Sequence, residues 1–491
     1  MKQTTGYSPL GLLAAVLFLV TPLMTQQLPA PEKIIEDMRL ANQYLMNKWP
    51  DPTVPTVKDR VRPSNIWTRA AYYEGLMMLY RVDPQATYYD YAVQWGAGHN
   101  WEPAYGGTRT ENADNQCCGQ TYIELYQVDP KPERIEKIKE TIDRMLNSDN
   151  NDAWWWIDAL QMAMPVFAKL GAIYEDDRYF EKMYSLYNFS KTQQGENGLY
   201  NPEDHLWWRD ADFEPPTTSP NGEDTYWSRG NGWVLTALAR VLDVMPENAP
   251  HREEYLTTFK EMAEALVPIQ REDGFWNVSL HDPEEFGGKE TSGTGFFVFG
   301  LAWGVNQGLL TDEKYKTAAV RGWNGLVNDA LHENGFLGYV QGTGKQPSDG
   351  QPLSYDKPAN FEDYGLGAFL LAGSEMFLMA GGSVQSSVEK QFNHHSQPER
   401  VKLCLAYPNP LNPDTRISYS LSEENQVDLM VFDTLGKRIF TFCESENQDA
   451  GEYQVGWNGM DDQGNSAPSG TYIIQIKAGD TVRSQKVTVI R

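Results

Sequence analysis

The sequence predicts an all-α (α/α)6 barrel followed by a small all-β, Ig-like sandwich. Nearly apolar helical segments recur along the chain, polar amphipathic helices alternate with them, and short alternating strands fill the C-terminal part. At 491 residues the chain is too long for one compact core. We expect a signal peptide over residues 1–25, a catalytic barrel over 32–381, a linker over 382–400 and the sandwich over 401–491.

An apolar run near the N-terminus predicts export. Lys2 precedes the run LGLLAAVLFLV, Leu10 to Val20, and polar sequence that contains proline follows it. The run is too short to span a bilayer and fits the hydrophobic region of a signal peptide, with cleavage expected after Thr25. An uncleaved anchor is the alternative. No later stretch reaches membrane-spanning length without charge, Gly or Pro, so we expect a secreted or cell-surface protein without a membrane span.

The apolar helical segments are the candidate inner helices of the barrel. They are rich in small residues and apolar on nearly every side, as buried helices are. Each runs for three to four turns and opens near a Gly or an aromatic residue. The six segments are Thr68–Tyr80, Cys117–Tyr126, Ile157–Leu170, Gly232–Met245, Thr294–Leu309 and Tyr364–Met379.

The polar helices that alternate with them each carry one apolar stripe, as outer helices do. Six inner and six outer helices in alternation predict a closed barrel, with an irregular helical solenoid as the alternative. Long aromatic loops would gather at one end and build a cleft there. The outer helices are expected at Glu32–Lys48, Pro84–Gly96, Pro132–Asn147, Asp177–Gln193, His251–Gln270 and Asp312–Asp329, and the loops at Trp95–Tyr105, Gly198–Trp227, Asp273–Glu290 and Glu333–Glu362.

The composition changes after the last inner helix. Residues 381–400 are polar and without periodicity, which is typical of a linker. Beyond them, turn residues separate short strands of alternating polarity, and such strands predict a β-sandwich. The expected strands are Arg416–Leu421, Val427–Phe432, Tyr453–Trp457, Tyr472–Lys477 and Lys486–Ile490.

Charge and composition exclude some functions. The chain carries 41 Lys and Arg against 67 Asp and Glu, a formal charge of −26, which argues against a nucleic-acid binder. Its 15 Trp and 26 Tyr offer flat faces of the kind that carbohydrate sites use, although large cores use them too. No CxxC, HExxH, Walker loop or GxGxxG motif occurs, so we expect neither a metal nor another cofactor.

The four cysteines have no metal-binding spacing. Cys117 and Cys118 are adjacent, which favours buried thiols over a strained disulfide. Cys404 and Cys443 could pair in the C-terminal region, because export permits disulfides.

Three dense motifs open inner helices: NADNQ at 112–116, WWWID at 154–158 and WSRGNGW at 227–233. If all inner helices run in the same direction, these motifs converge on one mouth of the barrel. Two carboxylates, Asp114 and Asp158, and one cation, Arg229, would then line one pocket. Their tryptophans, Trp155, Trp227 and Trp233, would wall it, although for each one a place in the core is the default interpretation.

Each polar residue of this pocket has two interpretations. Asp158 is either an ionised first-turn residue that backbone N–H groups satisfy, or a carboxyl whose pKa burial and a neighbouring carboxylate raise, so that it can donate a proton. Asp114 is that neighbour, or else a loop cap. Arg229 is either a clamp for an anionic substrate group or a structural tie to a loop.

Five ordered segments over roughly residues 35–380 resemble glycoside hydrolase family 105 and its relative family 88, the unsaturated rhamnogalacturonyl and glucuronyl hydrolases. They are NADNQCCGQTY, WWWIDALQMAMPVFAKLG, YWSRGNGWVLTALARVLDVMP, ETSGTGFFVFGLAWGVNQGLL and YGLGAFLLAGSE. The resemblance implies an (α/α)6 barrel with Asp158 as general acid/base and Asp114 as the second active-site carboxylate. It also implies substrate contacts from Arg229, Trp233 and His205, the last in a segment, PEDHLWWRD, that matches less closely.

The resemblance also implies an unusual reaction. Polysaccharide lyases leave a 4,5-unsaturated uronic acid at the non-reducing end of an oligosaccharide. These hydrolases protonate its C4 and add water at C5, and the partner sugar is then expelled. A non-catalytic sugar-binding protein, an (α/α)6 epimerase and a conventional glycosidase remain alternatives. The sequence leaves open whether the uronate comes from rhamnogalacturonan or ulvan, and it leaves the oligomeric state open.

The C-terminal region resembles a different family. The segments YPNPLNPDT, VFDTLGKRI and AGEYQVGWNGMDDQGNSAPSGTYIIQIKAGD are similar to the Ig-like sorting domain of proteins exported by the type IX secretion system, and to the flagellar-hook-cap Ig-like module. The resemblance implies the type IX machinery as a partner. A carbohydrate-binding sandwich is the alternative.

Overall fold

The computed structural model describes residues 27–384 and 401–489, apart from positions 59, 362, 404, 405, 407, 408, 412, 413, 422, 423, 435 and 480. The predicted signal peptide, most of the predicted linker and Cys404, with its predicted pairing to Cys443, therefore lie outside the described residues. Within the described part, no helix is both long enough and apolar enough to cross a membrane.

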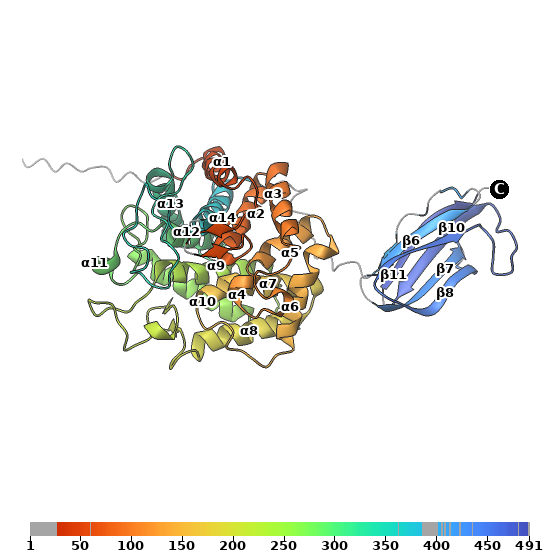
Figure 1. The fold of residues 1–491 in the computed structure, drawn as a ribbon, viewed down its shortest axis with the longest axis horizontal. Helices are drawn as coiled ribbons and strands as arrows, with labels where there is room; N and C mark the ends of the chain where they lie inside the picture. Colours follow the sequence, from red (N-terminus) through yellow and green to blue (C-terminus); the bar gives the residue numbers. More distant parts are fainter. Residues whose placement is uncertain are drawn as a thin grey trace, which may run out of the picture.

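The inner helices form a closed ring. Each packs against the next along the chain, and the last packs against the first, which closes the ring (Figure 1). Their apolar surfaces belong to one large buried core. The ring helices in the described chain are α2 (Trp67–Val82), α5 (Cys118–Val128), α7 (Asp158–Tyr174), α9 (Ser228–Val244), α12 (Thr291–Asn306) and α14 (Asp363–Met379).

The small residues of these helices allow the ring to close. A side chain at Gly75 of α2 would lie 2.5 Å from the carbonyl oxygen of Gly367 of α14. A side chain at Gly367 would lie 2.2 Å from the carbonyl oxygen of Ala71. The two backbones therefore meet where neither residue has a Cβ.

The outer helices alternate with the inner ones, which confirms the predicted (α/α)6 barrel. Short elements lie between the pairs, and the two-residue hairpins among them show too little alternation to be predicted. The outer helices are α1 (Pro31–Lys48), α3 (Ala86–Gly98), α6 (Glu136–Leu146), α8 (Asp177–Thr192), α10 (Arg252–Leu266) and α13 (Glu313–Gly325). The short elements that bear on the site are β1 (Thr56–Val57), β2 (Val61–Arg62), α4 (Ala113–Gln116), β3 (Tyr200–Asn201), β4 (Leu206–Trp207) and α11 (Pro283–Phe286).

Cys117 and Cys118, at the start of α5, are buried free thiols as predicted. Cys117 Sγ donates to Glu74 Oε1 at 3.2 Å, so the thiol belongs to a polar network inside the ring.

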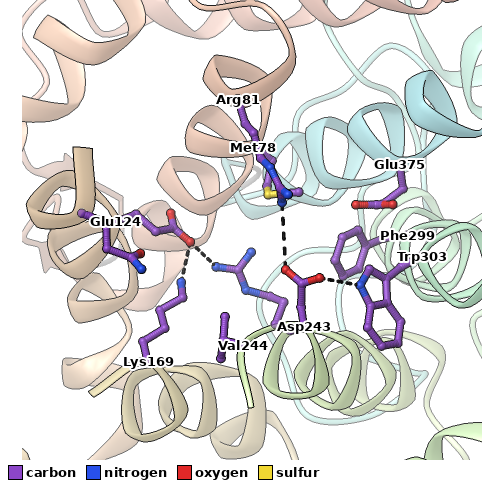
Figure 2. A pocket seen from close by; sticks show the side chains of 11 residues that line it. Met78, Arg81, Glu124, Lys169, Asp243, Val244, Phe299, Trp303 and Glu375 are labelled. Carbon is purple, nitrogen blue, oxygen red and sulfur yellow. Dashed lines mark hydrogen bonds and ion pairs between the residues drawn. The ribbon is translucent and has the colours of Figure 1, made fainter. Parts of the chain in front are cut away.

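The C-terminal ends of the inner helices enclose a charged cavity of about 110 Å³ (Figure 2). Glu124 of α5 accepts hydrogen bonds from Lys169 of α7 and from Arg240 of α9, the latter at 2.8 Å. Glu375 of α14 lies on the other side of the cavity and accepts from Asn306 Nδ2 at 2.8 Å. Ion pairs thus link helices around the end of the ring where their carbonyl ends meet, which is where cations are favoured.

Glu375 should make the stability of the barrel depend on pH. Burial raises the pKa of Glu375 from 4.5 to about 7. Between these two values the unfolded chain releases the proton while the folded chain keeps it, so stability falls as the pH rises from about 4.5 to 7. Replacing Glu375 by Gln removes the ionisation and keeps an acceptor for Asn306. We expect the variant to unfold at higher denaturant concentration than the wild type at pH 8, by on the order of 2 kcal/mol in the free energy of unfolding.

The matched control for this prediction is Glu284→Gln, because Glu284 is exposed on α11. It should leave the free energy of unfolding unchanged at both pH values. The advantage of Glu375→Gln should shrink at pH 5. Equal differences at pH 5 and pH 8 would show that Glu375 is ionised in the folded protein at both.

The C-terminal part is a β-sandwich with its own core, as predicted. Strands pair in the orders β11–β10–β7–β8 and β5–β6–β9. The sequence did not reveal β8, an edge strand with bulges whose polar residues blur the alternation, nor the short β5. The strands are β5 (Val401–Leu403), β6 (Thr415–Leu421), β7 (Asn425–Asp433), β8 (Arg438–Gln448), β9 (Gly451–Trp457), β10 (Gly470–Ala478) and β11 (Thr481–Val489).

Candidate active site

Two predicted carboxylates meet at the N-terminal ends of the inner helices. Asp114 lies in the first turn of α4, where Asn112 Oδ1 caps the helix by accepting from the Asp114 backbone N–H at 2.9 Å. Asp158 is the first residue of α7, against which α4 packs. The two carboxyls are close enough for the charge of Asp158 to raise the pKa of Asp114.

Asp158 is buried, with 7% of its surface exposed. Arg209 Nε donates to its Oδ2 at 3.3 Å, and the Ile157 N–H donates to the Arg209 carbonyl at 3.0 Å, so the loop of Arg209 is fixed to the start of α7. Burial raises the pKa of Asp158, and the positive charges of Arg209 and Arg229 oppose the rise. A raised pKa agrees better with Asp158 as a proton donor than with Asp158 as an ionised residue that only caps the helix.

Asp114 is half-buried at the edge of the site. Burial, followed by the charge of Asp158, raises its pKa to about 7, against the opposing charges of Arg209, Arg62 and Arg60. Because the two carboxyls interact, the titration belongs to the pair. The pair therefore holds a proton near neutral pH, which an acid/base catalyst requires.

Arg229 has the contacts of a structural tie. It is fully buried, and its Nη1 and Nη2 donate to the carbonyl oxygens of Gln341 and Gly342 at 2.9 and 2.8 Å. Its guanidinium also lies over the rings of Trp227 and Tyr364, at 4.4 and 4.9 Å. These contacts hold the 333–362 loop against the start of α9, as expected of a structural tie, and the role of Arg229 as a clamp for the substrate stays a prediction.

The three predicted tryptophans lie in different environments. Trp227 is buried and donates through Nε1 to Gln341 Oε1 at 2.8 Å. Trp233 is buried against Phe296, with ring centroids 4.1 Å apart. Trp155, in contrast, is 48% exposed and stands beside Arg209, whose guanidinium lies 5.6 Å from its ring. Of the three, Trp155 is the one with a face open to a ligand.

His205 sits in the turn between β3 and β4 with a positive φ of 55°. Its Nδ1 lies 3.0 Å from the hydroxyl of Tyr200 and 3.8 Å from Glu261 Oε2 of the outer helix α10. Its polar contacts are therefore with its own hairpin and an outer helix, and not with the carboxylate pair.

A cavity of about 310 Å³ opens beside Asp114. The β1–β2 hairpin and the start of α2 form much of its wall. Its lining residues are Arg60, Arg62, Ile66, Trp67, Tyr105, Asn112, Asp114 and Asn115.

Sequence reasoning missed three cations of this site, namely Arg209, Arg60 and Arg62. The segment KDRVR at 58–62 is a basic run in an acidic chain, and this signal could have identified the hairpin. Arg209 carried a weaker signal, as a lone arginine within the aromatic segment LWWRD.

Comparison with known proteins identifies a family for each part of the chain. The model of Glycosyl Hydrolase Family 88 matches residues 37–380, and that of the FlgD Ig-like domain matches residues 414–481. The unsaturated 3S-rhamnoglycuronyl hydrolase of Formosa agariphila is 35% identical over 330 residues, which are 63% of this chain and 84% of that protein.

Solved structures share the barrel. A glycosyl hydrolase family 88 protein from Bacteroides vulgatus superposes with a TM-score of 0.65 at 32% identity, over 71% of this chain and 99% of its own. A protein described as a polysaccharide lyase superposes with the same TM-score and identity, over 72% of this chain and 99% of its own.

Proposed function

The chain belongs to glycosyl hydrolase family 88, and on that premise we propose that it removes a 4,5-unsaturated uronic acid from the non-reducing end of oligosaccharides that lyases release. The observation that carries the proposal is the pair Asp114 and Asp158, which together hold a proton near neutral pH beside an arginine-lined cavity. The Formosa relative is named an unsaturated 3S-rhamnoglycuronyl hydrolase, so a rhamnose-linked uronyl group is the first substrate to test.

The chemistry requires a proton donor that also activates water. In the proposed reaction Asp158 gives its proton to C4 of the enol ether, which leaves a cation shared by C5 and the ring oxygen. Water adds at C5 and its proton returns to the carboxylate pair. The hemiketal opens to a C5 ketone, and the hemiacetal left at C1 then releases the partner sugar as an alcohol.

Residues near Asp158 can assist both the proton transfer to C4 and the addition of water at C5. Once Asp158 has lost its proton, Arg209 at 3.3 Å stabilises the carboxylate. Asp114 remains the second carboxylate, which orients the water or takes up its proton. Trp155 offers its exposed face to a sugar ring. Trp227, Trp233 and Arg229 then serve as the wall that holds these groups in place.

The proposal also covers the branch of the family to which the chain belongs and the route by which the protein is exported. We assign the chain to the branch that resembles family 105, because of the five motifs above. We assign the Ig-like module to type IX sorting, because PNP opens it and PSGTY stands near its end. Export as a secreted or cell-surface enzyme follows from these assignments and from the predicted signal peptide.

The deciding experiment incubates the enzyme with lyase digests of rhamnogalacturonan, ulvan and glycosaminoglycans. The conjugated enol ether absorbs in the ultraviolet, and its hydration removes that absorbance. We expect a loss of absorbance in at least one digest, with release of the partner sugar. A rise of absorbance on intact polysaccharide would identify a lyase, and cleavage of saturated glycosides alone would identify a conventional glycosidase. Binding without turnover would identify a sugar-binding protein.

Truncation after Gly382 should leave the chemistry unchanged. The barrel has its own hydrophobic core, and every residue assigned to the site precedes residue 382. We expect the kcat/KM of the truncated enzyme to stay within about twofold of that of the full chain on a disaccharide, because additive behaviour is usual for distant regions. A truncated enzyme that folds, as judged by circular dichroism, but loses most of its kcat/KM would show that the sandwich contributes to substrate binding.

A further inference from the structure

The β1–β2 hairpin brings two arginines to the cavity beside Asp114. Arg60 is exposed on the turn, and no ion pair of Arg60 occurs among the described residues. Arg62 is buried to 7% exposure, and its guanidinium lies 4.1 Å from the Phe361 ring and 5.9 Å from the Trp67 ring. A protein of charge −26 thus concentrates positive charge on one wall of its candidate site.

Different sets of arginines in the site act on Asp158 and on Asp114. Arg209 and Arg229 act on Asp158, whereas Arg62 and Arg60 act, with Arg209, on Asp114. Arg209 therefore acts on both carboxyls, whereas the hairpin arginines lie on the Asp114 side. Arg60 and Arg62 line the cavity there together with Asn112 and Asn115.

The proposed reaction places the carboxylate of the unsaturated uronate on the Asp158 side of the site, away from the hairpin arginines. The proton goes to C4, and the carboxylate is attached to C5, the next carbon. With Asp158 as donor, the reaction would bring that carboxylate toward Asp158 and its cation Arg209. The hairpin arginines are then left facing a different part of the substrate.

We propose that Arg60 and Arg62 form a subsite for a second anionic group, a sulfate ester or a carboxylate, on the sugar linked to the unsaturated uronate. This inference rests on the proposed function. A guanidinium donates two parallel hydrogen bonds to either group, and a cavity of about 310 Å³ falls at the small end of ligand-site sizes, which suits one sugar ring with its substituent. The enzyme would thus select charged oligosaccharides by a local contact, against the repulsion of its own net charge.

The test compares three unsaturated disaccharides that differ in the second sugar, which is neutral, sulfated or carboxylated. We expect the wild-type kcat/KM to be at least about tenfold higher for one of the anionic forms, and that form identifies the group. Arg60→Ala should lose most of this preference through a higher KM for the anionic form, so the ratio of kcat/KM between the anionic and the neutral disaccharide, taken within each enzyme, should fall toward one. Arg60→Lys should restore part of it.

The matched control is Lys58→Ala, because Lys58 is exposed on the same hairpin but does not line the cavity. It should keep the preference. Arg62 is buried, so Arg62→Lys, which retains the charge, is the second variant, and it should weaken the preference without unfolding the barrel.

Binding of the saturated counterparts, which cannot be hydrated, separates this inference from the proposed function. Calorimetry should show tighter binding of the anionic form to the wild type and loss of that difference in Arg60→Ala. Equal binding of all three disaccharides, or an equal loss in Arg60→Ala and Lys58→Ala, would overturn the subsite. Turnover that fails while the Arg60-dependent binding persists would overturn the hydrolase and keep the subsite.

Discussion

Replacing Asp158 by Asn should leave the barrel folded and reduce kcat/KM on an unsaturated disaccharide at least about 100-fold, because loss of a general acid typically has an effect of that size. Asn has the shape of Asp. Its Oδ1 can still accept a hydrogen bond from Arg209 Nε, which lies 3.3 Å from the Asp158 carboxylate in the wild type. It has no acidic proton for C4. The loss should therefore appear in kcat, measured as the rate at which the ultraviolet absorbance of the enol ether disappears.

Asp212→Asn is the matched control for this change. Asp212 lies three residues beyond Arg209, where it is exposed and pairs with Lys345 at 2.9 Å. Its removal should leave kcat unchanged. An Asp158→Asn enzyme that keeps more than about a tenth of the wild-type rate would show that another group protonates C4.

Replacing Asp114 by Asn should reduce the rate by a similar factor and change the pH profile as well. The raised pKa of Asp114, about 7, predicts that the carboxyl pair loses its shared proton near neutral pH, so that wild-type kcat/KM falls above pH 7. Without the charge of Asp114, the remaining carboxyl of Asp158 should release its proton more easily. The descending limb of the profile should then move to lower pH, by about one unit.

The pH profile and the residual rates of the two variants together decide which carboxyl is the proton donor. A profile that keeps its limb near pH 7 in Asp114→Asn would show that the limb does not come from the pair. If Asp114→Asn abolishes all activity while Asp158→Asn retains it, Asp114 is the donor and Asp158 is the partner. Asp212→Asn should reproduce the wild-type profile in both cases.

The carboxylates could be predicted from the sequence because their positions follow from helix order. Asp158 opens the ring helix α7 and Asp114 lies in the short helix just before the ring helix α5, and inner helices that run in one direction bring their first turns together. The arginines could not be assigned in this way. Arg229 stands in the densest motif, yet its Nη1 and Nη2 donate to the carbonyl oxygens of Gln341 and Gly342. Arg209 and Arg60 stand in loops, whose course only distant contacts define.

The tryptophans and His205 illustrate the same limit. Trp155, Trp227 and Trp233 look alike in the sequence, because each stands in a motif that opens an inner helix. The structure exposes Trp155 and buries the other two, because the 333–362 loop and Phe296 cover them. His205 faces Tyr200 and an outer helix, because its short hairpin turns it there.

The sequence by itself determined the barrel, the sandwich and the two carboxylates, because periodicity and helix order are local properties that survive in any packing. Only the tertiary structure decided which cations serve the site. A guanidinium on a long side chain can bind a carboxylate, a carbonyl or an aromatic ring, and the loops that surround it decide which of these it meets. In this protein they direct Arg229 into the wall of the site, Arg209 to Asp158, and Arg60 and Arg62 into the cavity beside Asp114.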